Sequence, residues 1–329
     1  MLAAIYRRFG PALETIELAD WDVGEPGEGE ALVDIEAAPV HFGDLLYVEG
    51  RLSTAPPPPA VAGSEGIGRI AALGPRVAGL SVGQRVWLPR KAGAFARRLR
   101  FAATRLVPAP EHGDPLQLAL VPVNALTSWL LVTRVVALGP GEWLLQNAAN
   151  SSCGRFILAI AKRLGLRTVN VVRRAELVAD LQAAGGDVVL LDGEDLPQRV
   201  AAATDGAPIR FAIDAVAGEA TTRLARCLAT DGVVAVYGLM SMQSCRVPAD
   251  LMFLNNLRLQ GFFTPHYERG LPRERWLEIM RDLGEWAADG TLRAKIAATY
   301  PLEQVHEAFR HELQSGAARD GKVILLPNG

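Results

Sequence analysis

The stretch from residue 118 to residue 289 constrains the fold of this chain more than any other feature. Short, nearly unbroken apolar runs such as EWLLQNA, RTVNVV and DVVLLD alternate there with amphipathic segments of helical length. Apolar runs of this kind suit strands that are buried on both faces, and helices between them cover a parallel sheet on both sides. The pattern therefore predicts an α/β domain with a doubly wound parallel sheet over residues 118–289.

The residues on either side of that stretch have a different pattern. ALVDIEAAPV alternates loosely, while EGIGRIAALG and GQRVWL are short β-like runs punctuated by glycine. APPPPA fits neither a helix nor a central strand, so it is expected to be a connector. The tail returns to strand-like pieces around PLEQVHEAFRHEL and in GKVILL. We therefore expect residues 1–117 and 290–329 to form one β-rich domain around the inserted α/β domain.

Composition excludes several classes of protein. The chain has 329 residues, enough for two domains with cores of their own, and a net charge of −2. A charge so close to zero does not indicate binding to nucleic acid or to an anionic membrane. The sequence contains no apolar run of about 18 residues, so no membrane span is expected. The N-terminus lacks a signal-peptide pattern, and three scattered cysteines fit a reducing compartment. We expect a cytoplasmic protein with a small-molecule substrate.

Residues 146–174, QNAANSSCGRFILAIAKRLGLRTVNVVRR, have the pattern of a strand, a turn, a helix and a second strand. The first turn of a helix leaves backbone N–H groups free and carries partial positive charge, so a pyrophosphate fits there. The turn holds one glycine, Gly154, where dinucleotide motifs have three, and this one still permits close packing of helix and strand. Asn150, Ser151 and Ser152 are short polar residues that either cap the helix or bind a phosphate oxygen.

The end of the second strand predicts which dinucleotide binds. In NAD-binding units an acidic residue about 20 positions after the glycine loop holds the ribose 2′-hydroxyl. Arg173 and Arg174 stand there instead. A carboxylate would repel a 2′-phosphate, whereas arginine binds one through two parallel hydrogen bonds. The loop therefore predicts an NADPH site, the alternative being two solvated charges at a strand end.

These motifs resemble those of a known family. AGSEGIGRIAALGPRVAGLSVGQRVW, at 62–87, resembles the Gly-x-Glu-x-x-Gly and Val-x-Gly-Leu-x-x-Gly-x-x-Val run of medium-chain dehydrogenase/reductases. Residues 146–174 are similar to the cofactor loop of the 2-enoyl thioester reductase branch, the trans-2-enoyl-CoA reductases, and YGLM, LQGFF and GKVILL continue the match. The resemblance implies a GroES-like catalytic domain around a Rossmann domain, NADPH as cofactor, and a homodimer.

The resemblance also implies a set of cofactor-binding residues. It places Asn124 beside the nicotinamide, Lys322 at the C-terminal cofactor lysine, and three groups along the rest of NADPH. These groups are Asn150, Ser151, Ser152 and Cys153 at the phosphates, Arg173 and Arg174 at the 2′-phosphate, and Tyr237, Gly238, Leu239, Met240, Phe262, Phe263 and Thr264 along the nicotinamide. Each has a structural alternative: a helix cap for Asn124, core packing for the aromatic residues and Cys153, and a solvated charge for Lys322.

A catalytic metal is not expected. Zinc members of the superfamily have a cysteine at the position of HFGD and a histidine before the glutamate of GSEG. This chain has His41 and Ser64 at those positions, and a serine hydroxyl is a poor zinc ligand beside a thiolate or an imidazole. We therefore predict an enzyme without metal, in which His41 is a hydrogen-bonded pocket or core residue.

Conjugate reduction is the chemistry that suits such a site: a hydride adds to the carbon β to a carbonyl, and a proton reaches the α carbon. The resemblance implies a tyrosine acid, but the alignment of APVHFGDLLYVEGRL puts Leu52 at its place. Tyr47 is the nearest phenol and our candidate acid; His41 and water are alternatives. We expect an NADPH-dependent oxidoreductase that reduces an enoyl thioester such as enoyl-CoA. The alternatives are an NADPH:quinone or small-enone reductase and a non-catalytic NADPH-binding sensor.

Overall fold

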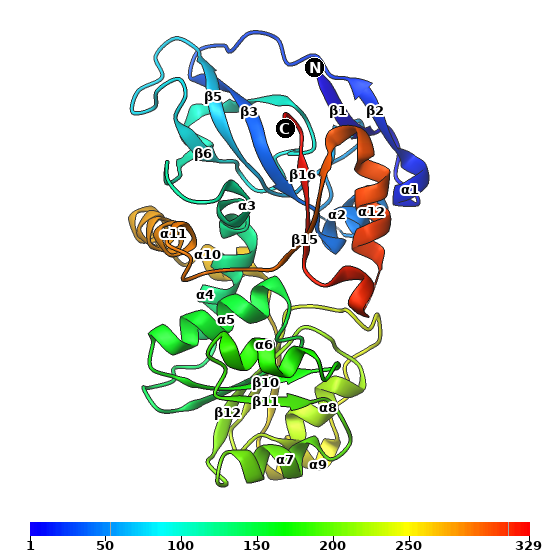
Figure 1. The fold of residues 1–329 in the computed structure, drawn as a ribbon, viewed down its shortest axis with the longest axis vertical. Helices are drawn as coiled ribbons and strands as arrows, with labels where there is room; N and C mark the ends of the chain where they lie inside the picture. Colours follow the sequence, from blue (N-terminus) through cyan, green and yellow to red (C-terminus); the bar gives the residue numbers. More distant parts are fainter. Residues whose placement is uncertain (53, 315) are drawn as a thin grey trace. The chain divides into compact units, whose positions relative to one another are not determined.

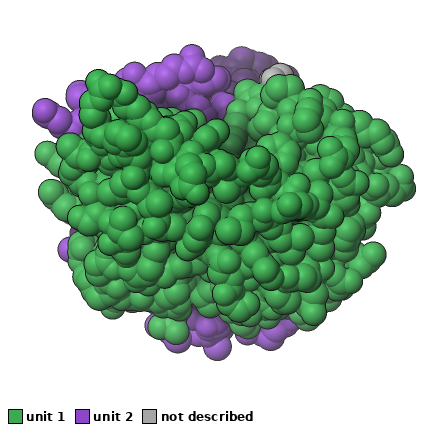
Figure 2. Space-filling model, turned by 90° about the horizontal axis from the view of Figure 1, so that it is seen from above, with its two compact units in different colours: residues 1–123, 277–329 green, residues 124–276 purple. Residues whose placement is uncertain are grey.

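The computed structural model describes residues 1–52, 54–314 and 316–329, and the chain divides into two compact units (Figure 2). Unit 1 comprises Met1–Val123 and Leu277–Gly329, and unit 2 comprises Asn124–Trp276. The sequence analysis places the boundaries at 117/118 and 289/290 instead. The intervening residues pack within unit 1, since the fully buried Leu118 accepts a hydrogen bond from Trp87 Nε1 at 2.8 Å. Gly284 also approaches Trp87 so closely that a Cβ would lie 2.4 Å from its ring.

Unit 1 contains two sheets and several short helices (Figure 1). One sheet has three strands in the order β2-β1-β4; the other has seven, in the order β15-β16-β3-β5-β6-β8 with β7 also paired to β3. The strands are β1 (Leu2–Tyr6), β2 (Ile16–Asp20), β3 (Glu30–Pro39), β4 (Ala60–Val61), β5 (Ile67–Leu73), β6 (Arg85–Trp87), β7 (Arg98–Ala102), β8 (Val107–Pro108), β15 (Ile296–Pro301) and β16 (Lys322–Leu326). The helices of this part are α1 (Ala12–Thr15), α2 (Phe42–Val48), α3 (Pro115–Leu118), α11 (Arg273–Ala288, which begins in unit 2) and α12 (Val305–Leu313).

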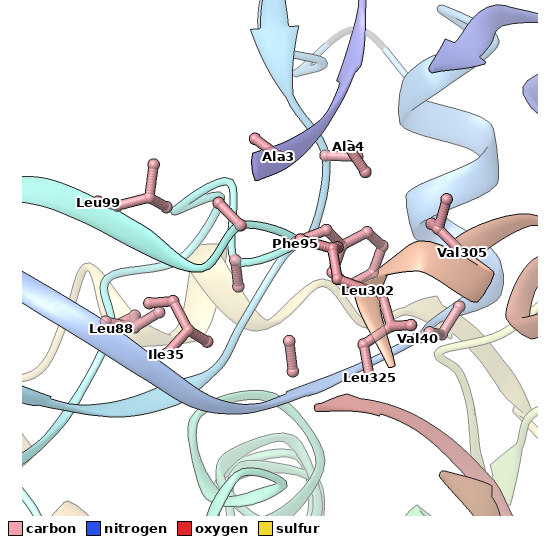
Figure 3. Close-up of a cluster of buried hydrophobic side chains, with 14 of the residues drawn as sticks. Ala3, Ala4, Ile35, Val40, Leu88, Phe95, Leu99, Leu302, Val305 and Leu325 are labelled. Carbon is pink, nitrogen blue, oxygen red and sulfur yellow. The ribbon is translucent and has the colours of Figure 1, made fainter. Parts of the chain in front are cut away.

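The C-terminal tail completes the larger sheet of unit 1. Strand β16 pairs with β15 in parallel and with β3 in antiparallel register, where Leu325 lies opposite Ala38. The buried side chains of β3, β16 and α12 meet in one core (Figure 3). In that core Phe95 and Phe309 pack edge to face, with their ring centres 6.0 Å apart. The tail therefore folds back onto the N-terminal segment.

The strand-like pieces expected around PLEQVHEAFRHEL include β15, but most of this stretch is helical. Only its first residue, Pro301, belongs to a strand; a short 3₁₀ turn (Leu302–Gln304) follows, and then helix α12. The cause is the spacing of the apolar residues Leu302, Val305, Ala308 and Phe309, which recur every three or four positions. All four are fully buried, so they form one face of a helix that packs on β15 and β16.

Unit 2 is built on a six-stranded sheet in the order β11-β10-β9-β12-β13-β14, in which every adjacent pair is parallel. Helices α5 and α6 cover one face, and α7, α8 and α9 cover the other (Figure 1). The strands are β9 (Trp143–Gln146), β10 (Arg167–Val172), β11 (Val188–Leu191), β12 (Ile209–Asp214), β13 (Val233–Val236) and β14 (Arg258–Gly261). The helices are α4 (Leu126–Arg134), α5 (Ser152–Arg163), α6 (Leu177–Ala183), α7 (Leu196–Ala203), α8 (Glu219–Arg226), α9 (Ala249–Leu254) and α10 (Thr264–Glu268).

This arrangement confirms the predicted α/β class with a doubly wound parallel sheet. The strand order reverses between β9 and β12, and ligands of such sheets bind where the carboxyl ends of the strands diverge. Pro122 interrupts a helical stretch as expected, because a π-helical segment (Val121–Ala125) precedes α4. Among the described helices, none is both apolar enough and long enough to cross a membrane.

Candidate active site

The turn after β9 brings α5 close to the sheet. Ser151 is the N-cap of α5, and its Oγ accepts a hydrogen bond from the backbone N–H of Gly154 at 3.1 Å. A Cβ on Gly154 would lie 2.6 Å from the carbonyl oxygen of Ala149, so only glycine allows this approach. Asn150 and Ser152, on either side of the cap, are half-buried. The free N–H groups of the first helical turn therefore lie at the carboxyl end of β9, as a pyrophosphate site requires.

A buried polar pair joins the carboxyl ends of β9 and β12. Asn147 Nδ2 donates to Asp214 Oδ1 at 2.6 Å, and Asn147 Oδ1 accepts from the backbone N–H of Ala215 at 2.8 Å. Asp214 is fully buried and also accepts from Thr221 Oγ1 and two backbone N–H groups. The sequence analysis missed this pair, although each residue is the polar end of an apolar strand. The pair holds the two strand ends at the point where the sheet order reverses.

Four predicted cofactor residues lie together in unit 2. Asn124 Nδ2 donates to the Sγ atom of Cys153 at 3.2 Å, and the Tyr237 hydroxyl is hydrogen-bonded to the side chains of Ser151 and Cys153. Burial raises the pKa of Tyr237 well above its usual value, so the phenol is neutral. Asn124 Oδ1 is buried and has no hydrogen-bond partner among the described residues. A buried acceptor without a donor fits a site that is completed by a ligand.

Arg173 and Arg174 directly follow β10, at the same edge of the sheet as the α5 turn. Arg173 is exposed, whereas the Arg174 side chain is 20 % exposed and lies 3.3 Å from Glu176 Oε1. The Glu176 carboxylate of this ion pair is exposed to solvent, so the pair contributes little energy. The structure thus places both arginines at the carboxyl end of β10, and their contact with a 2′-phosphate stays a prediction.

The segments after β13 and β14 hold the remaining predicted residues of unit 2. Phe262 is buried and stacks on Tyr267 at 4.4 Å, and Thr264 Oγ1 shares a 2.8 Å hydrogen bond with Thr127 Oγ1. Gly238 lies so close to the strand end at β12 that a Cβ would meet a carbonyl oxygen at 2.5 Å. Three other predicted residues of these segments, Leu239, Met240 and Phe263, have exposed side chains.

In unit 1, Lys322 belongs to a buried chain of three side chains. Its Nζ lies 3.0 Å from His41 Nδ1, and His41 Nε2 lies 2.6 Å from Glu65 Oε1. Glu65 Oε2 accepts a hydrogen bond from the backbone N–H of Val123 at 2.7 Å. Glu65 is fully buried, while Lys322 is 7 % and the His41 side chain 15 % exposed. The sequence analysis considered His41 and Lys322 separately and did not identify Glu65 as a partner.

Burial dominates the electrostatics of this chain. It lowers the pKa of His41 to about 3, helped by the nearby Lys322 ammonium, so the imidazole is neutral. It raises the pKa of the Glu65 carboxyl, and Lys322 and the Val123 N–H group oppose that rise. A lysine can only donate hydrogen bonds, so His41 Nδ1 is the acceptor and Nε2 carries the proton.

The two positions where zinc ligands were considered are both engaged in protein contacts. His41 bonds to Glu65 and Lys322, and Ser64 Oγ donates to Asp44 Oδ1. The other Asp44 oxygen accepts from the backbone N–H of His41 at 2.8 Å, which fixes the start of α2. Within residues 1–52, 54–314 and 316–329, no group of three or more His, Cys, Asp or Glu residues could hold a metal ion.

Tyr47, the candidate acid, lies on α2 beside a small pocket. Lys91 contributes to the same pocket; its Nζ lies 5.4 Å from the centre of the Tyr47 ring and donates to the backbone oxygen of Thr54. Burial lowers the pKa of Lys91. The residues that line the pocket are Tyr6, Asp44, Tyr47, Val48, Pro56, Val61, Ala62, Gly63, Ser64 and Lys91. Lys91 carried no recognisable signal in the sequence.

Comparison with known proteins identifies the family. Residues 27–111 match the family model described as alcohol dehydrogenase GroES-like domain, and residues 153–284 match that of zinc-binding dehydrogenase. Enoyl-[acyl-carrier-protein] reductase, mitochondrial, of Xenopus tropicalis is 30 % identical over 316 residues, which cover 93 % of this chain and 90 % of that protein. The chain belongs to the medium-chain dehydrogenase/reductase superfamily, in its enoyl thioester reductase and quinone reductase branch.

Solved structures of this superfamily resemble the chain over its full length. A Bacillus thuringiensis protein named NADPH:quinone reductase has a TM-score of 0.89 at 25 % identity, with 99 % of this chain and 98 % of that chain covered. Etr1p of Candida tropicalis, a 2-enoyl thioester reductase solved as a heterodimer with Etr2p and in a complex with NADP and crotonyl-CoA, has a TM-score of 0.87. It is 22 % identical, with 99 % of both chains covered. The predicted combination of a GroES-like domain and a Rossmann domain is thereby confirmed.

Proposed function

We propose that this chain reduces a carbon–carbon double bond conjugated to a thioester carbonyl, as in enoyl-CoA or an enoyl-acyl carrier, with NADPH as the reductant. The chain is an NADPH-dependent oxidoreductase, and its relatives include proteins named enoyl-[acyl-carrier-protein] reductase and NADPH:quinone reductase. The observation that carries the thioester assignment is the similarity to enoyl-[acyl-carrier-protein] reductase along 93 % of the chain. The two arginines after β10 support the choice of NADPH over NADH.

The residues of unit 2 fit an NADPH molecule. Gly154 and Gly238 leave room for close backbone approach, and the buried Asn124 Oδ1 offers an acceptor with no partner among the described residues. We assign Arg173 and Arg174 to the 2′-phosphate and the α5 turn to the pyrophosphate. When bound, NADPH supplies the hydride that the β carbon receives. Tyr237 and the residues after β13 and β14 orient its nicotinamide end.

Unit 1 offers the groups that handle the proton. Reduction leaves negative charge on the thioester oxygen, and the α carbon then needs a proton. Tyr47 is the proposed donor, because its phenol borders a pocket that also holds the Lys91 ammonium. Leu52, which aligns with the tyrosine implied by the family resemblance, has no acidic proton to give.

A second candidate function is the reduction of a quinone or a small enone with NADPH. It is favoured by the leucine at position 52 and by the structural similarity to the protein named NADPH:quinone reductase. Such acceptors carry no thioester, and their reduced oxygen can take its proton from water. Both candidates use the same cofactor residues and differ only in what unit 1 accepts.

We also propose that the chain forms a homodimer through β14. This strand is an edge of the unit 2 sheet, and unpaired edges are ready to bind a further strand. The nearby side chains of Phe253, Leu254 and Leu259 are 73 %, 69 % and 40 % exposed, an unusual amount of apolar surface beside an open edge.

The curated relatives are mitochondrial by name, so a cytoplasmic location stays a prediction.

The test follows NADPH absorbance in the presence of crotonyl-CoA, of a simple quinone and of a small enone, each in a separate assay. Turnover with crotonyl-CoA alone supports the thioester reductase. Turnover only with the quinone or the enone overturns the thioester assignment in favour of the second candidate. NADPH binding without turnover of any of the three would contradict both candidates.

A further inference from the structure

The chain Glu65–His41–Lys322 links segments that lie far apart in the sequence. Glu65 precedes β5, His41 precedes α2, and Lys322 is the first residue of β16, 281 positions after His41. All three side chains belong to unit 1 and are buried or nearly so. Burying an ionisable group costs free energy unless the group has a hydrogen-bond or ion-pair partner, and each of these three side chains has one.

The hydrogen bonds assign the tautomer of His41. The Lys322 ammonium donates to His41 Nδ1, so the neutral imidazole carries its proton on Nε2 and donates that proton to Glu65 Oε1. The second Glu65 oxygen already accepts from the Val123 N–H group. The neutral imidazole therefore joins the Lys322 side chain to the Glu65 carboxyl group, whose pKa burial raises.

We propose that Glu65 and His41 are positioning residues that act through Lys322, holding its ammonium in one orientation so that it binds an anionic group of NADPH. This inference rests on the proposed function, because NADPH is the ligand assigned there. An ammonium has three N–H donors, and the bond to His41 uses one of them. The two others are free to turn toward a ligand. A lysine without this support would keep its flexible stem and lose affinity to rotamer entropy.

The first test measures the Kd of NADPH by fluorescence titration of the full-length protein. His41→Leu is expected to raise the Kd about tenfold, because Lys322 loses its acceptor. Glu65→Gln is expected to raise the Kd in the same direction, because one amide oxygen cannot replace both carboxyl oxygens, which bond to His41 and to the Val123 N–H group. His41→Gln is the matched rescue: its amide can accept from Lys322 and donate to Glu65, so the Kd is expected within about threefold of the wild-type value. Lys295→Met controls for general charge, since that lysine lies on the surface of the same unit and pairs with Asp320.

A double-mutant cycle separates positioning from a general structural effect. In the background of Lys322→Met, His41→Leu is expected to raise the Kd no further, because nothing remains for it to position. Additive losses of affinity, or equal losses in His41→Leu and His41→Gln, would overturn the inference.

A second measurement needs no ligand. ¹⁵N NMR of the wild-type protein, with the five histidines assigned by variants, is expected to show His41 as the neutral Nε2–H tautomer between about pH 5 and pH 8. A doubly protonated ring or the Nδ1–H tautomer in that pH range would contradict the hydrogen bonds assigned to Glu65, His41 and Lys322. If the wild type does not bind NADPH, both the proposed cofactor and the ligand assigned to Lys322 are wrong. The NMR result then tests only whether the hydrogen bonds among Glu65, His41 and Lys322 exist.

Discussion

The Lys91 ammonium lies 5.4 Å from the centre of the Tyr47 ring, and its Nζ is tied to the backbone oxygen of Thr54. A cation at this distance from an aromatic ring is attracted to its electron-rich face, so Lys91 and the Tyr47 ring restrain each other. The phenol is thereby placed at the border of a pocket that also contains Asp44 and Ser64. A proton donor has to be held in one place, and this contact supplies that restraint.

Removing the Tyr47 hydroxyl tests its role directly. Tyr47→Phe is expected to lower kcat at least about tenfold and to leave the Kd of NADPH and the Tm nearly unchanged, because only the acidic proton is lost. Tyr300→Phe is the matched control, since the Tyr300 hydroxyl bonds to His311 in a different part of unit 1. An unchanged kcat in Tyr47→Phe would exclude the phenol from the mechanism.

The two arginines after β10 are expected to determine cofactor preference. Replacing Arg173 and Arg174 by alanine should raise the Kd of NADPH at least tenfold and leave that of NADH within about twofold, because only NADPH carries the 2′-phosphate. Arg167→Ala serves as the control, since Arg167 lies at the other end of β10 and stacks on Trp143. Equal weakening of both dinucleotides, measured by fluorescence titration, would refute the phosphate assignment.

The close approach of α5 to the sheet makes Gly154 intolerant of a side chain. Gly154→Ala is expected to lower the free energy of unfolding by about 1–3 kcal/mol, since its Cβ would lie 2.6 Å from a carbonyl oxygen. NADPH affinity should fall as well, because the helix N-terminus has to shift. Gly270→Ala, where a Cβ would meet nothing within 4 Å, should change stability by no more than about 1 kcal/mol. Chemical denaturation of both variants checks the difference.

The stability of the protein is expected to depend on pH through His41 and Glu65. The pKa of His41 is lowered from 6.5 to about 3 by burial, so its neutral form stabilises the fold above pH 6.5, and this contribution is lost as the pH falls toward 3. The pKa of Glu65 is raised from 4.5 by burial, so its contribution is complete below pH 4.5 and is lost as the pH rises through the folded-state value. The other charged groups that act on His41 are Lys322, Asp44, Glu312 and Arg90.

Variants separate these two contributions. His41→Gln should flatten the decrease in Tm on the acid side, between about pH 6.5 and pH 3, and Glu65→Gln should flatten the decrease that begins above pH 4.5. Differential scanning fluorimetry across that range checks both. If the two variants keep the wild-type pH profile, other groups determine it.

The edge of the unit 2 sheet predicts the oligomeric state. Leu259→Asp on β14 is expected to convert a dimer to a monomer in analytical ultracentrifugation, because a charge on an edge strand opposes pairing with a second copy. Leu313→Asp, at an equally exposed leucine of unit 1, should have no effect. A Leu259→Asp protein that remains a dimer would show that the subunits associate elsewhere.

The parallel sheet could be predicted because its strands are apolar runs separated by helical segments; RTVNVV and DVVLLD are two such runs. Helix α12 was missed, although its buried residues Leu302, Val305, Ala308 and Phe309 have the spacing of a helix face. The arginines after β10 could be located by counting from the glycine turn. The partnership of Glu65 with His41 and Lys322 could not, because it depends on contacts between residues up to 281 positions apart that carry no local pattern.

The position of β16 has a consequence for the biosynthesis of the protein. Its five residues lie between β3 and β15, so this edge of β3 stays open until residues 322–326 have been synthesised. When residues 322–326 are synthesised, unit 2 (residues 124–276) is already complete, whereas the first 123 residues still lack the last strand of their sheet. A premature stop codon before residue 322 would therefore leave the earliest-made part of the protein incomplete and its strand edge available for aggregation.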